Sequence, residues 1–141
     1  MTIDWILLPL FVQVGLTFFL LFWMGFVRVG ALKRREVTIP DIALRQPAWP
    51  ERPTRIANAY HNQLELPLLF YVLVILALIT RKADLLFVVM SWMFVVTRLV
   101  HAGIQVTSND VQRRFSAFLV GALILLLMWI IFALRILFGA L

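Results

Sequence analysis

Of the chain's 141 residues, 63% are hydrophobic and 14% are charged, a composition typical of an integral membrane protein with one domain. The formal net charge is +6, but the basic residues lie mainly in short connections between apolar runs, which argues against nucleic-acid binding and for contacts with lipid headgroups or an anionic ligand. Cysteine is absent, which excludes disulfides, thiolate metal sites and a thiol nucleophile carried by the protein itself.

Four apolar stretches predict four transmembrane helices. No charge lies between Asp4 and Arg28, and none lies between Arg114 and Arg135, so the first and last stretches are each long enough to cross a bilayer. The first stretch is also too long for the apolar core of a signal peptide. The predicted fold class is therefore an all-α, four-helix integral membrane bundle. Its helices are expected over residues 4–31, 54–81, 84–106 and 110–138.

The connection over residues 32–53 is expected to be a basic cytoplasmic loop. Residues 33–55 carry six lysine and arginine side chains, Arg45 among them, against three acids. The third connection also ends in basic residues, so the positive-inside bias places both loops in the cytoplasm and both termini outside, in an inner or cell membrane. Several prolines, including Pro47, predict an extended and stiff loop, in which Trp49 is a candidate interfacial anchor.

Glu65 is the only acid far from any loop, and an ionisable residue inside a membrane span indicates a functional site with a partner. At a helical rise of ~1.5 Å per residue, Glu65 lies roughly 24 Å from Arg81, and Arg98 lies roughly 21 Å from Asp84. Since Arg81 and Asp84 flank one tight turn, Glu65 and Arg98 are expected at nearly equal depth. Polar side chains share a helix face with each of them: Asn58, Asn62 and, at the edge, His61 with Glu65, and His101 and Gln105 with Arg98.

Simpler interpretations of these residues remain open. Glu65 and Arg98 could form an interhelical salt bridge that fixes helix register and does nothing else. His61, Glu65 and His101 could hold a metal ion, although the nearby arginines disfavour a divalent cation. His61 could simply lie at the headgroup boundary, and the arginines at the ends of the spans could be snorkelling anchors.

Three short segments stand out along the chain: Asn58–Pro67 (NAYHNQLELP), Arg98–His101 (RLVH) and Arg113–Phe115 (RRF). They resemble motifs of the MAPEG family, the membrane-associated proteins in eicosanoid and glutathione metabolism, and in particular its members similar to microsomal glutathione transferases. The four-helix length and the long basic first loop fit the same family, so the resemblance covers nearly the whole chain. It implies a homotrimer that binds glutathione between neighbouring subunits near the cytoplasmic face.

The resemblance also implies roles for individual residues. Asn62 and Glu65 would hold the polar backbone of glutathione, with Glu65 suited to the α-amino group. Arg28 and His101 would contact its other polar groups, and Arg98 would orient the site. His61 and Gln105 complete the set of glutathione-binding candidates.

Arg114 is the catalytic candidate that the resemblance implies, because a nearby guanidinium stabilises a thiolate. The activated thiolate would attack a hydrophobic electrophile or a lipid hydroperoxide that enters from the bilayer. Gln105, however, occupies the position where relatives carry a tyrosine near the thiol, and glutamine has no phenolic proton. A non-catalytic scaffold that binds glutathione or lipid is therefore the main alternative. A proton-coupled small-molecule exporter with Glu65 as the coupling carboxylate is the third.

Overall fold

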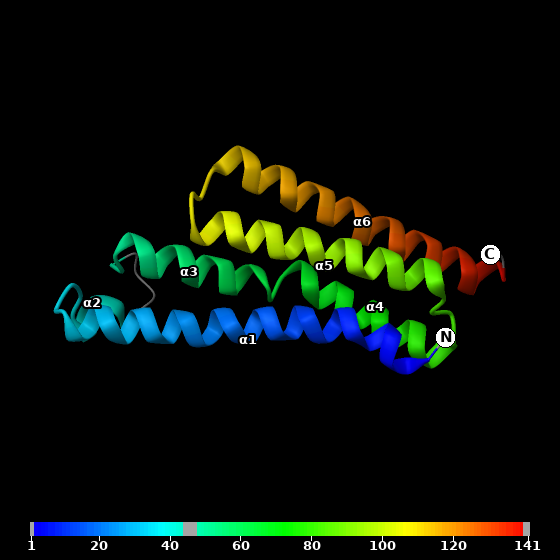
Figure 1. Ribbon diagram of the computed structural model, residues 1–141, viewed down its shortest axis with the longest axis horizontal. Coiled ribbons are helices and arrows are strands. Elements are labelled where there is room, and N and C mark those ends of the chain that lie inside the picture. The colour runs from blue at the N-terminus through cyan, green and yellow to red at the C-terminus, as the bar shows by residue number, and fades with distance from the viewer. Residues whose placement is uncertain (1, 44–47, 140–141) are drawn as a thin grey trace.

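The computed structural model describes residues 2–43 and 48–139, and every regular element in these two ranges is an α-helix (Figure 1). The predicted all-α fold is therefore confirmed. Arg45 and Pro47 of the predicted basic loop lie outside the described residues. In chain order the helices are α1 (Ile3–Lys33), α2 (Ile39–Ile42), α3 (Glu51–Asn62), α4 (Leu66–Thr80), α5 (Leu85–Val106) and α6 (Val111–Phe138).

The helices form one elongated bundle in which α3 lies between α1 and α5, and α4 continues from α3 and packs against α1 and α6 (Figure 1). Helix α5 packs against α1, α3 and α6, and the buried rings of Phe70 and Phe94 meet in the core with centroids 4.9 Å apart. Both termini lie at one end of the bundle, together with the α4–α5 turn. The opposite end, called the loop end below, carries α2 and the α5–α6 connection.

The surface of the bundle is apolar over most of its length. Large side chains such as Phe22 and Phe26 are 71% and 78% exposed. A soluble protein rarely exposes so much contiguous apolar surface, whereas a bilayer accommodates it. Within the described ranges, four helical segments are long and apolar enough to cross a membrane, namely Ile3–Lys33, Glu51–Thr80, Leu85–Val106 and Val111–Phe138.

The second predicted helix, over residues 54–81, is not continuous. Helix α3 begins before residue 54 and ends at Asn62, and α4 begins at Leu66 after a tight turn of three residues. The cause is Pro67, which has no N–H to donate to the carbonyl of Gln63 and whose ring crowds that carbonyl. The backbone N–H groups of residues 63–65 instead donate three residues back, at 2.9, 3.0 and 3.4 Å. Glu65 consequently lies at the N-cap of α4 rather than inside a helix.

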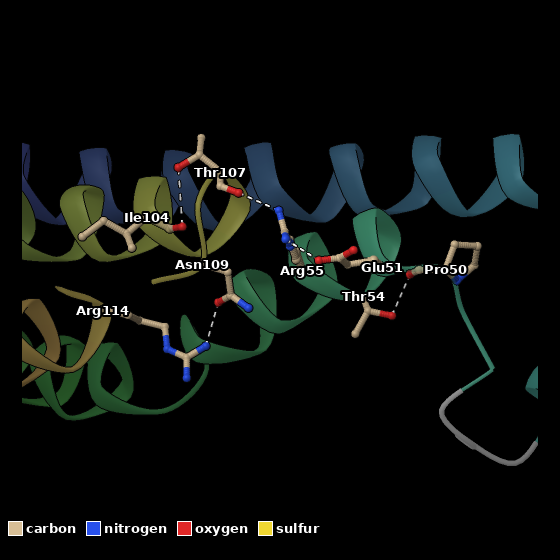
Figure 2. Close-up of polar contacts among 8 residues, drawn as sticks. All are labelled: Pro50, Glu51, Thr54, Arg55, Ile104, Thr107, Asn109 and Arg114. Atoms are coloured by element: carbon tan, nitrogen blue, oxygen red, sulfur yellow. Dashed lines mark hydrogen bonds and ion pairs between the residues drawn. The ribbon is translucent and has the colours of Figure 1, made fainter. Parts of the chain in front are cut away.

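Polar contacts at the loop end join α3 to the end of α5 and fix the start of α6 (Figure 2). Arg55 on α3 donates to the carbonyl of Thr107 at 2.6 Å and forms an ion pair with Glu51 one turn earlier. Asp110 caps α6 by accepting hydrogen bonds from two backbone N–H groups of its first turn, at 3.0 and 3.4 Å. These contacts tie α3 to the connection between α5 and α6 and fix the residue at which α6 begins.

An ion pair closes the opposite end of the bundle. Arg135 on α6 pairs with the carboxylate of Asp84 at 2.8 Å and donates to the carbonyl of Lys82 at 3.1 Å. Asp84 also caps α5 by accepting from the N–H of Phe87 at 3.0 Å. Partial burial is the largest influence and raises the pKa of Asp84, but the hydrogen bonds from Arg135 and Phe87 together with the charge of Arg135 hold it below its ordinary value. The α4–α5 turn is thereby fastened to α6.

Candidate functional site

A cavity of about 430 Å³ opens in the loop-end half of the bundle, between α3, α5 and α6. Its volume lies in the range of roughly 300–1,000 Å³ that is usual for small-molecule sites. Six of the eight predicted site residues line this one cavity. The lining consists of Asn58, His61, Asn62, Glu65, His101, Gln105, Val111, Arg114, Phe115 and Phe118.

The polar side chains converge because of their spacing along two helices. Residues three or four positions apart share a helix face, so Asn58 and Asn62 on α3 face the cavity together, as do His101 and Gln105 on α5. The Nδ2 atom of Asn62 donates to Oε1 of Gln105 at 3.3 Å, which joins the two faces directly. Glu65 follows at the break, where its exposed carboxylate reaches the same cavity.

Arg98 lies behind the cavity wall rather than in it. Its side chain is 1% exposed, and its Nη2 donates to the backbone carbonyl of Asn62 at 3.2 Å. Among the described residues, no hydrogen-bond partner is present for its Nε and Nη1 atoms. The ion pairs within 4.0 Å in these parts of the chain do not include one between Arg98 and Glu65. The interpretation of the two residues as a direct salt bridge is therefore wrong, and Arg98 instead braces the last turn of α3.

His101 is buried at the back of the cavity, and its ring lies 6.1 Å from that of Phe118. Its Nδ1 atom has no hydrogen-bond partner within the described part of the chain. The alternative of a metal site formed by His61, Glu65 and His101 is not supported, because no three His, Cys, Asp or Glu side chains among residues 2–43 and 48–139 are grouped closely enough to hold an ion. His101 is instead available to a polar ligand.

The adjacent arginines at the start of α6 face different sides of the helix. Arg114 is half-buried, lines the cavity and donates from Nη1 to Oδ1 of Asn109 at 2.8 Å (Figure 2). Arg113 is 76% exposed, lies 3.8 Å from Asp110 and lines a separate, larger cavity of about 760 Å³ between α5 and α6. One residue turns an α-helix by about 100°, which is sufficient to separate the two guanidinium groups. Arg114 is therefore the arginine that can meet a ligand beside Glu65.

Arg28 does not line this cavity. Its guanidinium carbon lies 4.9 Å from the ring centroid of Trp49, a distance suited to a cation–π contact. Trp49, the predicted interfacial anchor, therefore packs on α1 at the loop end. Within one chain the structure does not bring Arg28 to Glu65 and Arg114, and its contact with glutathione stays a prediction.

A buried pair of glutamines was missed by the sequence analysis. Gln13 on α1 and Gln63 at the break are both fully buried, and Nε2 of Gln13 donates to Oε1 of Gln63 at 2.8 Å. Gln63 in turn donates to the carbonyl of Ala59 at 2.9 Å. The available signal was a lone glutamine in the uncharged first apolar run. The pair braces the α3–α4 break from the side of α1, as Arg98 braces it from the side of α5.

Comparison with known proteins places this site in a family. The model of the MAPEG family matches residues 6–134, a range that covers most of each of the four spans and every residue that lines the cavity. No curated protein and no solved structure matches the chain. The resemblance inferred from the segments Asn58–Pro67 and Arg98–His101 is thus confirmed at the level of the family. This chain belongs to the MAPEG family and is an integral membrane protein.

Proposed function

We propose that the protein binds glutathione in the cavity between α3, α5 and α6 and transfers it to, or uses it to reduce, a hydrophobic substrate. The observation that carries the proposal is that one cavity holds the carboxylate of Glu65 and the guanidinium of Arg114, with the amides of Asn62 and Gln105 also in its wall. Glutathione presents an ammonium, two carboxylates, two amides and a thiol, so it needs donors and acceptors of both charges. Membership of a family that includes glutathione transferases supports this assignment.

In this proposal Glu65 pairs with the α-amino group of glutathione, while Asn62 and His101 hydrogen-bond its polar backbone. Arg114 faces the sulfur and favours the thiolate over the thiol. The thiolate then forms a bond to an electrophilic carbon, and the leaving group departs with the bonding electron pair. Phe115 and Phe118 on α6 supply an apolar wall along which a substrate dissolved in the bilayer can approach the sulfur.

Gln105 supports a second candidate, a scaffold that binds glutathione or lipid without turnover. Its Oε1 atom is occupied by the hydrogen bond from Asn62, and a glutamine amide cannot supply a phenolic proton. In the catalytic proposal, activation of the thiol therefore rests on Arg114 alone. The two candidates differ in turnover and not in binding, so a single set of measurements separates them.

The expected assembly is a homotrimer, as the family resemblance implies, with both termini on the non-cytoplasmic side. In such a trimer Arg28 of one subunit would face the cavity of the next. This arrangement would bring a second guanidinium, in addition to that of Arg114, to the anionic tripeptide, while each subunit keeps the fold described above.

The adjacent arginines provide a matched test of the proposed chemistry. In detergent, wild-type protein is expected to conjugate glutathione to a chromogenic electrophile, and Arg114→Ala to lower kcat/KM by roughly 10²–10³-fold, the usual effect of losing one preorganised stabilising donor. Arg113→Ala, which changes the same charge on the other side of α6, is expected to retain the wild-type rate. Equal losses in the two variants, or a retained rate in Arg114→Ala, would reject the role given to Arg114.

Calorimetry separates the scaffold from the enzyme. Both candidates predict that wild-type protein binds glutathione and that Glu65→Gln weakens binding by roughly tenfold or more, since one charge-assisted hydrogen bond is lost. Binding without conjugation or peroxide reduction would favour the scaffold. Absence of glutathione binding by wild-type protein would end the enzyme proposal and the glutathione-binding form of the scaffold.

A further inference from the structure

A second recess at the loop end shares no residue with the glutathione cavity. It is a cleft of about 540 Å³ between the end of α1 and the start of α3. Part of its lining is apolar, and the other part, called the basic mouth below, carries Lys33, Arg34 and Arg52. Glu36 is the one acid among the described residues that line it.

The α1 wall of the cleft changes character along one helix face. Phe26, Val29, Gly30 and Lys33 follow an i, i+3, i+4, i+7 pattern and therefore lie above one another. Phe26 is 78% exposed and Val29 is 51% exposed, so their side chains are open to the bilayer. The face thus passes from apolar to basic in the direction of the loop end, which is the order of acyl chain and headgroup in the adjacent leaflet.

The basic mouth is held in shape by short-range contacts. The guanidinium of Arg34 lies over Gly30, where a Cβ atom would meet its Nη1 at 3.1 Å, and Nε of Arg34 donates to Glu36 at 3.0 Å. Pro50 and Pro53 form the opposite wall, and their fixed φ angles limit its movement. With Lys33 and Arg52 beside this pair, the mouth keeps an excess of positive charge.

We propose that this cleft binds an anionic membrane phospholipid. The phosphate contacts Lys33, Arg34 and Arg52, and one acyl chain lies along Phe26 and Val29. Charge complementarity selects an anionic headgroup over a zwitterionic one, because three cations face one acid. The apolar part of the lining selects a lipid over a free phosphate, because only a lipid has an acyl chain that can cover Phe26 and Val29. The site is independent of glutathione binding.

The test uses purified full-length protein in detergent, offered equal amounts of phosphatidylglycerol and phosphatidylcholine with identical acyl chains. Retained lipid is counted by native mass spectrometry. Wild-type protein is expected to retain phosphatidylglycerol preferentially. Lys33→Gln/Arg52→Gln is expected to lower that retention roughly tenfold, since two basic side chains near an anionic group are lost. The matched control is Arg81→Gln/Lys82→Gln, which removes two basic side chains from the opposite end of the bundle and is expected to retain lipid as wild type does.

A third variant tests the shape of the cleft with its basic residues intact. Gly30→Leu fills the cleft and is expected to reduce lipid retention, while circular dichroism reports whether the helices remain formed. Equal retention of both lipids by wild type, or equal loss in the control variant, would overturn the proposal. Competition by glycerol phosphate as effective as that by whole lipid would show a soluble anion site instead. A change of oligomeric state in Lys33→Gln/Arg52→Gln with lipid retention unchanged would show an interface between copies, which also overturns it.

Discussion

Arg98 and Arg135 are buried arginines with opposite surroundings, and replacing each by methionine tests what buried charge does in this fold. Arg98 donates one hydrogen bond, to the carbonyl of Asn62, while its Nε and Nη1 atoms have no hydrogen-bond partner among the described residues. Arg135 has a carboxylate partner in Asp84 at 2.8 Å and a carbonyl partner at 3.1 Å. Methionine keeps much of the length of arginine without the charge or the donors.

The two substitutions are expected to change stability in opposite directions. Arg98→Met loses one hydrogen bond from a charged group, worth about 1.5–3 kcal/mol. It also removes a buried cation whose desolvation costs several kcal/mol, so the free energy of unfolding is expected to stay unchanged or rise. Arg135→Met loses two partnered contacts, and because Asp84 is half exposed the expected loss is limited to about 1–3 kcal/mol.

Thermal unfolding in detergent, with and without glutathione, measures both effects. Arg98→Met is expected to melt at or above the wild-type temperature but to lose most of its stabilisation by glutathione, because Arg98 holds the turn that carries Asn62 and precedes Glu65. Arg135→Met is expected to melt at a lower temperature and keep its glutathione response. If Arg98→Met were destabilised more than Arg135→Met, the balance between desolvation and hydrogen bonding argued above would be refuted.

Two further changes test the packing and the ion pair of the bundle. Gly121→Ala places a methyl group 2.6 Å from the hydroxyl oxygen of Thr97, so either that hydroxyl gives up its hydrogen bond to the carbonyl of Phe94 or α5 and α6 move apart. We expect the free energy of unfolding to fall by about 1–3 kcal/mol. Gly25→Ala, with nothing within 4 Å of its added Cβ, is expected to cause no loss. Because the pKa of Asp84 lies below its ordinary value of 3.8, its pair with Arg135 stabilises the fold fully above that value and is lost as pH falls through the lower, folded-state pKa. Melting temperatures between about pH 6 and pH 3 are therefore expected to fall more steeply in wild type than in Asp84→Asn, and identical slopes would contradict this role.

The number and extent of the spans were predictable from the sequence. A bilayer of fixed thickness demands about 20 consecutive apolar residues with every backbone hydrogen bond satisfied internally, and this requirement can be counted along the chain. The same reasoning predicted that Asn62, Glu65, His101 and Gln105 lie at nearly one depth in the membrane and share helix faces, since helical rise and periodicity are local properties. The position of Arg98 at that depth was also predicted, but its partner was not.

The packing of one helix against another was decided only in the tertiary structure. A membrane helix is apolar on its lipid face and on its packed face alike, so its sequence carries little sign of which face turns inward. For that reason the apolar pattern alone could not tell which of Arg113 and Arg114 faces the cavity, and it did not pair Gln13 with Gln63. Pro67 interrupts the helix locally, but the side chains that brace the resulting break, Gln13 on α1 and Arg98 on α5, are distant in the chain. Sequence determined the spans and the chemistry available to them, and the rotation of each helix determined which groups meet.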